Sequence, residues 1–402
     1  MRMLWEQYVY RRGNEVFELW DGLFSGRDIK PLYIGGRGFD VRSQAVLAAF
    51  VASVKGSAVS VQDAKQLLIG FSGYRLDDDI KALTETNTTE LTRIFSEIGT
   101  TEELPFGGPT EGDEEISTSN ALRAGVAKVQ AQLDGYTDVI LDISSLPRIV
   151  YLTLLTSLLN HFIPNKEIDP EREHPLVASG VNFQVLVGED AALDAHIRAE
   201  DPSNELVLIP GYSAVLQLGS LLELPLVWFP ILGENRVNQL EKVLNSDYIP
   251  ARAEVCPVVP HPSKDPRRAD RLLVEYSGPL FDTGLTTTSS VLYAHESHPF
   301  EAYRQLLSAM RRYRDSMLIL GGCRLVVTPL GSKLITLGAG LACFEMHPEN
   351  LSKKYGVGIP YAEPTRYVAS AEKLTRSSPI ISALVLTGEA YGITPATAST
   401  PA

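Results

Sequence analysis

Cysteine is scarce in this sequence, and no two cysteines are closely spaced. The three cysteines are Cys256, Cys323 and Cys343, and none belongs to a CxxC motif. A disulfide framework or a structural zinc site needs several cysteines at close, regular spacing. The sequence therefore indicates neither, and it predicts a protein of a reducing compartment.

Long apolar runs are also missing. The N-terminal stretch MRMLWEQYVYRRGNE has no apolar core of signal-peptide length, and no later segment is an uninterrupted apolar run of transmembrane length. We therefore expect a soluble, cytoplasmic protein with no membrane partner.

Positive charge is in deficit. Lys and Arg number 36 against 49 Asp and Glu, which gives a net charge of −13. A surface that binds duplex nucleic acid over a broad area needs a basic footprint. The charge argues against such a surface, but a local basic pocket for a small phosphorylated ligand remains compatible with it.

Familiar catalytic and metal-binding signatures are absent as well. The chain has no GxSxG nucleophile elbow and no glycine-rich phosphate loop ending in lysine. The turn His295-Glu296-Ser297-His298 lacks the i, i+4 histidine spacing of the helical HExxH zinc motif. We therefore assign no catalytic residue and predict no metal site.

What the chain does have is the composition of a globular protein and a regular alternation of strand and helix patterns. A hydrophobic content of 44% suits a sizeable core, and 402 residues predict two or three domains. The alternation predicts an α/β fold with a doubly wound, mainly parallel, Rossmann-like sheet. The predicted division is a lead-in segment over 1–30, a Rossmann-like domain over 31–250, a proline-rich connector over 251–290, a second, smaller α/β lobe over 291–393 and a disordered tail over 394–402.

The stretch DVILDISSLPRIVYLTLLTSLL, which starts at Asp138, reads as a buried strand, a polar loop and an apolar helix. Asp142 stands at the predicted strand end, Ser144 and Ser145 at helix-entry positions, and Pro147 in the first helical turn. Arg148 would aim its guanidinium back at the loop. Free N–H groups, hydroxyls and a positive charge suit a phosphate or carboxylate. The alternative is a plain helix cap without a ligand.

An earlier stretch has the same form. A strand from Pro31 to Ile34 is followed by the turn GGRGFDVR and an apolar helix. The glycines allow tight backbone geometry and close approach of a ligand, while Asp40 accepts hydrogen bonds and the arginines add positive charge. The residues assigned to ligand binding here are Gly35, Gly36, Arg37, Gly38, Asp40 and Arg42. Glycines required for steric reasons alone are the alternative. If the two strands are neighbours in the sheet, both loops face one ligand.

A third stretch, LVVTPLGSKLITLGAGLAC, repeats this form and indicates an internal duplication. Thr328, Ser332 and Lys333 are its candidate ligand-binding residues.

Two segments are predicted to lack strands. The range 101–115 is rich in glycine, proline and acidic residues, and 257–270 holds four prolines, which exclude a central strand. Arg267 and Arg268 in this connector either pair with neighbouring acids or reach into the cleft to hold a phosphate.

Three family resemblances follow from these loops. DISSLPR, and still more TPLGSK, resembles the threonine, glycine and lysine loop after the fourth strand of CRISPR-associated Rossmann-fold ligand sensors. In that family this loop and the turn after the first strand bind cyclic oligonucleotides. IGGRGFDVR is similar to the first motif of S-adenosylmethionine methyltransferases, with Gly36, Gly38 and Asp40 at the matched positions. The strand ending in Asp142 and its hydroxyl-rich loop resemble those of phosphoribosyltransferases.

The first hypothesis is therefore a two-lobed protein that binds a nucleotide or nucleotide-like phosphorylated ligand and signals to a protein partner or a second copy. The arginines would neutralise phosphate, Ser144 and Ser145 would donate hydrogen bonds, and Asp40 and Asp142 would accept them from ribose or base. The second hypothesis is an enzyme that transfers a methyl or a phosphoribosyl group. For methyl transfer its cofactor would be S-adenosylmethionine. A non-catalytic scaffold subunit is the third.

Overall fold

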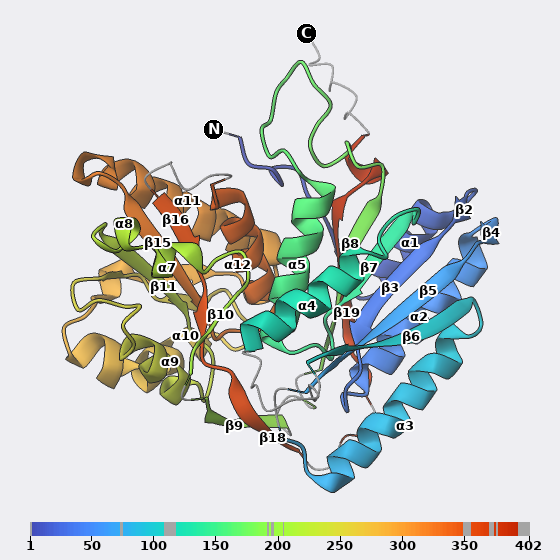
Figure 1. The fold of residues 1–402 in the computed structure, drawn as a ribbon, viewed down its shortest axis with the longest axis horizontal. Coiled ribbons are helices and arrows are strands. Elements are labelled where there is room, and N and C mark those ends of the chain that lie inside the picture. The colour runs from blue at the N-terminus through green and yellow to red at the C-terminus, as the bar shows by residue number, and fades with distance from the viewer. Residues whose placement is uncertain are drawn as a thin grey trace.

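Two sheets stand side by side, each with helices packed on it (Figure 1). The computed structural model describes residues 2–72, 75–107, 118–190, 193, 197–203, 205–348, 355–369, 374 and 377–392. No helix in these ranges is long and apolar enough to cross a membrane.

The strands and helices alternate along most of the chain, as the sequence patterns predict. The strands are β1 (Val9–Arg12), β2 (Asp28–Ile29), β3 (Pro31–Gly36), β4 (Ser60–Val61), β5 (Ala64–Phe71), β6 (Gly99–Phe106), β7 (Asp138–Asp142), β8 (Asn182–Glu189), β9 (Ile197–Pro202), β10 (Val207–Leu208), β11 (Leu226–Ile231), β12 (Glu254–Val255), β13 (Val258–Pro260), β14 (Leu292–Ala294), β15 (Cys323–Pro329), β16 (Tyr355–Gly358), β17 (Pro360–Tyr361), β18 (Pro364–Ala369) and β19 (Ile380–Thr387). The α-helices are α1 (Glu15–Phe24), α2 (Arg42–Ser57), α3 (Asp78–Phe95), α4 (Thr118–Gln130), α5 (Arg148–Phe162), α7 (Ala214–Gln217), α8 (Gly219–Leu222), α9 (Val237–Leu244), α10 (Arg268–Glu275), α11 (Pro299–Met317) and α12 (Lys333–Met346). Short 3-10 or π turns cover Ser277–Asp282, Thr288–Ser290, Leu318–Leu320 and Glu389–Tyr391.

The first sheet confirms the expected doubly wound arrangement. Its order is β1-β19-β8-β7-β3-β5-β6, and all neighbouring pairs from β8 to β6 are parallel. The chain runs outward from β3 to β6 and then returns to the other side of β3 with β7. The predicted loops after β3 and β7 therefore follow neighbouring strands, at the point where ligands bind in such sheets.

Alternation along β3 places helices on both faces of this sheet. Leu32 and Ile34 belong to the cluster that includes α4 and α5, whereas Tyr33 belongs to the cluster that includes α1, α2 and α3. Successive side chains of a strand point to opposite faces, so both faces must be covered by apolar surface.

The second sheet repeats the same winding. Its order is β14-β13-β11-β15-β16, with β12 also on β11, and all of these pairs are parallel. The chain runs outward from β11 to β14 and returns to the other side of β11 with β15. The second sheet thus has its own reversal point, between the loops that follow β11 and β15.

Helices α5 and α12 join the two sheets. They pack against each other in the middle of the molecule (Figure 1). Most residues of each helix are buried, around the whole circumference rather than along one stripe. An all-round apolar helix is stable in water only when it is covered on every side, and here each covers the other.

The N-terminal segment ties the two halves together at a second place. The Leu4 amide donates to Glu345 of α12 at 3.0 Å, and the Trp5 indole donates to the Leu386 carbonyl of β19 at 3.0 Å. Trp5 is fully buried and packs edge-on against Tyr303 of α11. Residues 1–30, predicted as a lead-in segment, thus also supply β1, α1 and β2.

Two sequence expectations are wrong. The range 101–115 was expected to be a loop, but Gly99–Phe106 forms edge strand β6; residues 108–115 lie outside the described chain. The connector 257–270 contains β13, which lies between β11 and β14. This strand is only three residues long and its prolines lie at its ends, so little ladder hydrogen bonding is lost.

The strands of the two sheets also do not follow the predicted division of the chain into lobes. β11 falls in the range 31–250 but pairs in the second sheet, and β19 falls in 291–393 but pairs in the first. Hydrophobic patterns locate strands without showing which strands pair. The predicted disordered tail, 394–402, lies outside the described residues.

Two helical glycines give a matched test of this packing. A methyl group at Gly338 of α12 would lie 2.1 Å from the Pro299 carbonyl oxygen and 2.8 Å from Ala302, whereas one at Gly56 of α2 would meet nothing within 4 Å. We expect Gly338→Ala to lower the free energy of unfolding by about 1–3 kcal/mol through overpacking. Gly56→Ala should leave it unchanged or raise it by up to about 1 kcal/mol, because alanine favours helix. Urea unfolding of both variants measures this; equal effects would contradict the packing of α12 on α11.

Candidate functional site

A cavity of about 810 Å³ opens where the reversal points of the two sheets face each other. The first sheet contributes residues 38–40, 42, 144–148 and 187–189, and the second contributes 233–236 and 330–333. Tyr151, Ile197, Glu200, Arg268, Tyr361 and Tyr367 complete the lining. We refer to this cavity as the central cleft.

Asp142 fixes the shape of the loop between β7 and α5. Its carboxylate accepts hydrogen bonds from the Ser144 amide at 2.9 Å, the Ser144 hydroxyl at 2.5 Å and the Tyr33 hydroxyl at 2.8 Å. The Ser144 hydroxyl in turn accepts from the Gly188 amide at 2.8 Å. Burial raises the pKa of Asp142, although these hydrogen bonds oppose the shift. Asp142 is buried beneath the loop and does not line the cleft.

The loop touches the glycine turn that follows β3. The Ser145 hydroxyl donates to the Gly36 carbonyl at 3.1 Å, and a methyl group at Gly36 would lie 2.7 Å from that hydroxyl oxygen. A side chain at position 36 would therefore force the Ser145 hydroxyl to move, and glycine lets the two loops meet without this shift. This is the steric role of the glycines that the sequence allowed as the alternative to ligand binding.

The two pattern-related loops exchange their basic side chains. Arg148, at the start of α5, donates to the Gly331 carbonyl at 2.6 Å and to the Tyr361 hydroxyl at 3.1 Å. Lys333, at the start of α12, donates to the Ile143 carbonyl at 2.9 Å and to the Ser144 carbonyl. Each loop is thus held by the cation that follows the other loop. We call this arrangement the crossed pair.

The turn after β3 is held mainly by its own charges. The Arg42 guanidinium contacts the Asp40 carboxylate at 2.6 Å, and both residues are buried at the cleft wall. Arg37 turns the other way and pairs with Glu85 at 2.6 Å and Glu103 at 2.9 Å.

The second sheet adds two arginines that the assigned set of site residues did not include. Arg236, in the loop after β11, donates to Gln239 at 3.2 Å, and no described carboxylate lies within ion-pair distance of it. Arg268 pairs with Glu234 and with Glu296, each at 2.5 Å. The sequence left two interpretations of Arg268 open: pairing with neighbouring acids, or reaching into the cleft to hold a phosphate. The structure shows the pairing with acids, and it also places Arg268, but not Arg267, in the lining of the cleft. That Arg268 holds a phosphate stays a prediction.

Glu363, between β17 and β18, is a further residue that was not identified from the sequence. It is 5% exposed, and neither of its carboxylate oxygens has a hydrogen-bond partner in the described structure. Burial raises its pKa to about 8, while the charges of Arg148 and Arg236 lower it. A buried carboxyl without hydrogen bonds is costly to ionise, so this group holds its proton near neutral pH.

Aromatic side chains line the same cavity. Phe39 and Tyr367 lie with ring centroids 6.4 Å apart, and the Arg148 guanidinium lies 5.5 Å from the centre of the Tyr361 ring. Tyr151 is buried beside them. Flat aromatic surfaces next to cations can accommodate a nucleobase as well as its phosphate.

The structure brings most of the predicted site residues together. Those that line the central cleft are Gly38, Asp40, Arg42, Ser144, Ser145, Arg148, Ser332 and Lys333. Those outside its lining are Gly35, Gly36, Arg37, Asp142 and Thr328. Thr328 accepts a hydrogen bond from Trp228 at 2.9 Å and is fully buried. Whether any of these residues binds a ligand stays a prediction.

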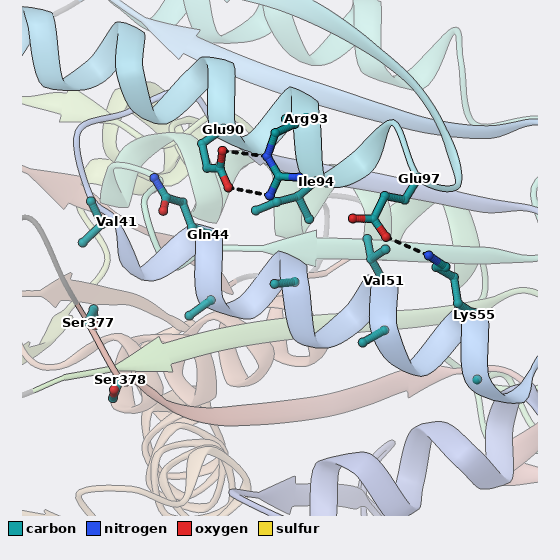
Figure 2. Close-up of a pocket in the computed structure, with 14 residues that line it drawn as sticks. Val41, Gln44, Val51, Lys55, Glu90, Arg93, Ile94, Glu97, Ser377 and Ser378 are labelled. Atoms are coloured by element: carbon teal, nitrogen blue, oxygen red, sulfur yellow. Dashed lines mark hydrogen bonds and ion pairs between the residues drawn. The ribbon is translucent and has the colours of Figure 1, made fainter.

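A second hollow, of about 920 Å³, lies between α2 and α3 (Figure 2). Small residues of α2 line part of it, and the labelled charges pair with one another, Glu90 with Arg93 and Lys55 with Glu97, each at 2.8 Å. Exposed ion pairs of this kind contribute little and leave no charge for a ligand. The central cleft is therefore the better candidate site.

The histidine turn has a structural role. His298 caps α11 by accepting from the Glu301 amide at 3.3 Å, and Glu296 pairs with Arg268. Within the described ranges, no group of three or more His, Cys, Asp or Glu side chains is placed to hold a metal ion.

Comparisons with known proteins give no family. No protein-family model matches the chain, and no curated protein matches it. Among solved structures, a candidate universal stress protein from Pseudomonas aeruginosa aligns at 10% identity over 86% of this chain and 94% of its own, with a TM-score of 0.22. A P. aeruginosa protein of unknown function aligns at 8% identity over 84% and 92%, with a TM-score of 0.21. A phosphoglycerate mutase from Leishmania mexicana aligns at 10% identity over 94% and 73%, with a TM-score of 0.23. TM-scores this low carry no argument about function.

The crossed pair can be tested through Lys333. Lys333→Met keeps an unbranched side chain that is one atom shorter but removes the donors to two backbone carbonyls, so we expect a loss of about 1–3 kcal/mol in the free energy of unfolding. Lys55→Met is the control, because Lys55 is 50% exposed and pairs only with Glu97 among the described residues. Its loss should stay below about 1 kcal/mol. Equal losses in the two variants, measured by urea unfolding, would show that Lys333 does not join the lobes.

The ionisation of Glu363 can be tested through the pH dependence of stability. Its pKa in the folded protein, about 8, lies above the ordinary value of 4.5. The contribution of Glu363 to the free energy of unfolding is therefore fully present below about pH 4.5. It is lost as the pH rises towards 8, by at most about 5 kcal/mol. Glu363→Gln should remove this contribution and raise the melting temperature more at pH 8 than at pH 5. A melting temperature raised equally at both values would refute the assignment.

Proposed function

We propose that the central cleft binds a nucleotide or nucleotide-like phosphorylated ligand, and that the protein acts as a ligand sensor or regulatory subunit for a partner protein. One observation carries this proposal: two doubly wound sheets direct their reversal points, and the loops that follow them, into a single cavity. Each such point is by itself a common place for a ligand in open α/β sheets.

The chemistry of the lining supports a phosphorylated ligand. Arg236 offers a guanidinium without a paired carboxylate in the described structure, and Ser145 and Ser332 line the same cavity with hydroxyl-bearing side chains. Charge-assisted hydrogen bonds from arginine are well suited to phosphate oxygens. A volume of about 810 Å³ is within the range of small-molecule sites.

The aromatic lining supports the nucleotide part of the proposal. Phe39 in the turn after β3, Tyr361 in β17 and Tyr367 in β18 contribute aromatic rings to the lining of the cleft. The resemblance of DISSLPR and TPLGSK to the loops of CRISPR-associated Rossmann-fold sensors points to the same ligand class. A role in signalling rests on the crossed pair, because a ligand that competes for Arg148 or Lys333 would loosen a contact between the lobes.

The test combines ligand identification with one pair of variants. The protein purified from its own cytoplasm is analysed by native mass spectrometry, and any released small molecule is identified after denaturation. We expect a nucleotide or oligonucleotide. Arg236→Gln should weaken its binding about 10- to 100-fold, the usual worth of a charged hydrogen bond to phosphate. Arg93→Gln, which alters an exposed arginine on the α2–α3 groove, should leave binding unchanged.

Other outcomes are informative. Recovery of S-adenosylmethionine would favour the methyltransferase hypothesis instead. An empty protein that also shows no thermal shift with a panel of nucleotides would overturn the proposal and favour a scaffold. Equal weakening by both arginine variants would place the ligand outside the central cleft.

A further inference from the structure

Glu363 is unusual among the carboxyl groups around the central cleft. Asp40 pairs with Arg42, Glu189 with Arg12, and Glu234 with Arg268. Glu363 has no ion pair and no side-chain hydrogen bond in the described structure, although it is 5% exposed. Such a group in a folded protein needs a reason, because burying it without a partner is costly.

The charges that act on Glu363 come from two elements of the cleft wall. Among the described residues they are Arg148, at the start of α5, and Arg236, just before α9. Both guanidiniums line the cavity. The backbone around Glu363 is held separately, since its carbonyl accepts from the Ser203 amide at 2.8 Å and the Ala362 carbonyl accepts from Gln239 at 3.0 Å. The backbone that carries this carboxyl group is therefore held in place, near two cations that line the cleft.

An anion in the cleft and an ionised Glu363 would compete for the same positive charge. When an anion reaches Arg148 and Arg236, it adds negative charge near Glu363 and disfavours ionisation of the carboxyl group. Linkage requires the converse as well, so that a neutral Glu363 strengthens anion binding by the same factor.

We propose that the central cleft takes up a proton together with its anionic ligand, and that Glu363 is the group that carries this proton. The inference rests on the proposed anion site and adds its regulation. The pKa of Glu363, raised to about 8 by burial, places the switch close to neutral pH. Arg148 and Arg236 bind the anion, and Glu363 is a positioning residue that sets their net charge.

Sulfate is a suitable probe, because its charge stays constant between about pH 6.5 and about pH 9. Its affinity is measured by calorimetry across this range for the whole protein, against chloride at equal ionic strength. We expect the affinity of the unaltered protein to fall by about tenfold per pH unit once Glu363 ionises. Glu363→Gln mimics the neutral carboxyl group and should bind sulfate with the same affinity at both ends of the range.

Two further measurements make the result specific. Calorimetry in buffers of different ionisation enthalpy should show close to one proton taken up per sulfate at about pH 9 in the unaltered protein, and none in Glu363→Gln. Glu200→Gln is the matched control, because Glu200 lines the same cleft but is exposed. It should keep the full pH dependence. Near-ultraviolet circular dichroism checks that each variant is folded.

The failures of the two proposals are distinguishable. Sulfate binding with the same pH dependence in Glu363→Gln, or without proton uptake in the unaltered protein, would overturn the coupling and leave the anion site intact. Absence of sulfate binding at any pH in this range, in both proteins, would overturn the anion site and the coupling together.

Discussion

The crossed pair of Arg148 and Lys333 is the contact on which the arrangement of the two lobes depends. Each side chain starts a helix in one lobe and donates to backbone carbonyls of the other. Backbone carbonyls inside a protein need donors, and here a charged group supplies them from across the cleft. The same contact positions α5 against α12 and keeps the two reversal points facing one cavity. The geometry of the cleft and the association of the lobes therefore have a common origin.

Much of the fold could be predicted from the sequence, because strands buried on both faces leave clear apolar runs. The α/β class is confirmed, and β3 and β7, whose adjacency the sequence left as a condition, are neighbours in the sheet. β13 was missed because a three-residue strand between prolines has no detectable period. β6 was missed because Glu102 and Glu103 give an edge strand a polar pattern that resembles a loop. The division between sheets escaped prediction because apolar pattern does not encode pairing partners.

The site was predictable only in part, for a related reason. The loops that follow β3, β7 and β15 carry glycine, hydroxyl and basic residues in a recognisable order, so eight residues of the cleft lining were identified. Arg236 and Glu363 stand outside any such motif, and their importance comes from what surrounds them after folding. The sequence also could not show that Arg37 and Arg42 would pair with acids. A sequence shows how many charged side chains are present, but not how many of them remain unpaired after folding.

The pairing of β1 with β19 has a consequence for the way the chain is made. β1 ends at Arg12, and its only partner in the described sheet, β19, begins at Ile380. During synthesis the first strand must therefore wait for its partner until residues 380–387 have left the ribosome. The second sheet, complete by Gly358, is finished before the first. Completion of the first sheet is thus held back by sequence separation, which slows the formation of long-range strand pairs.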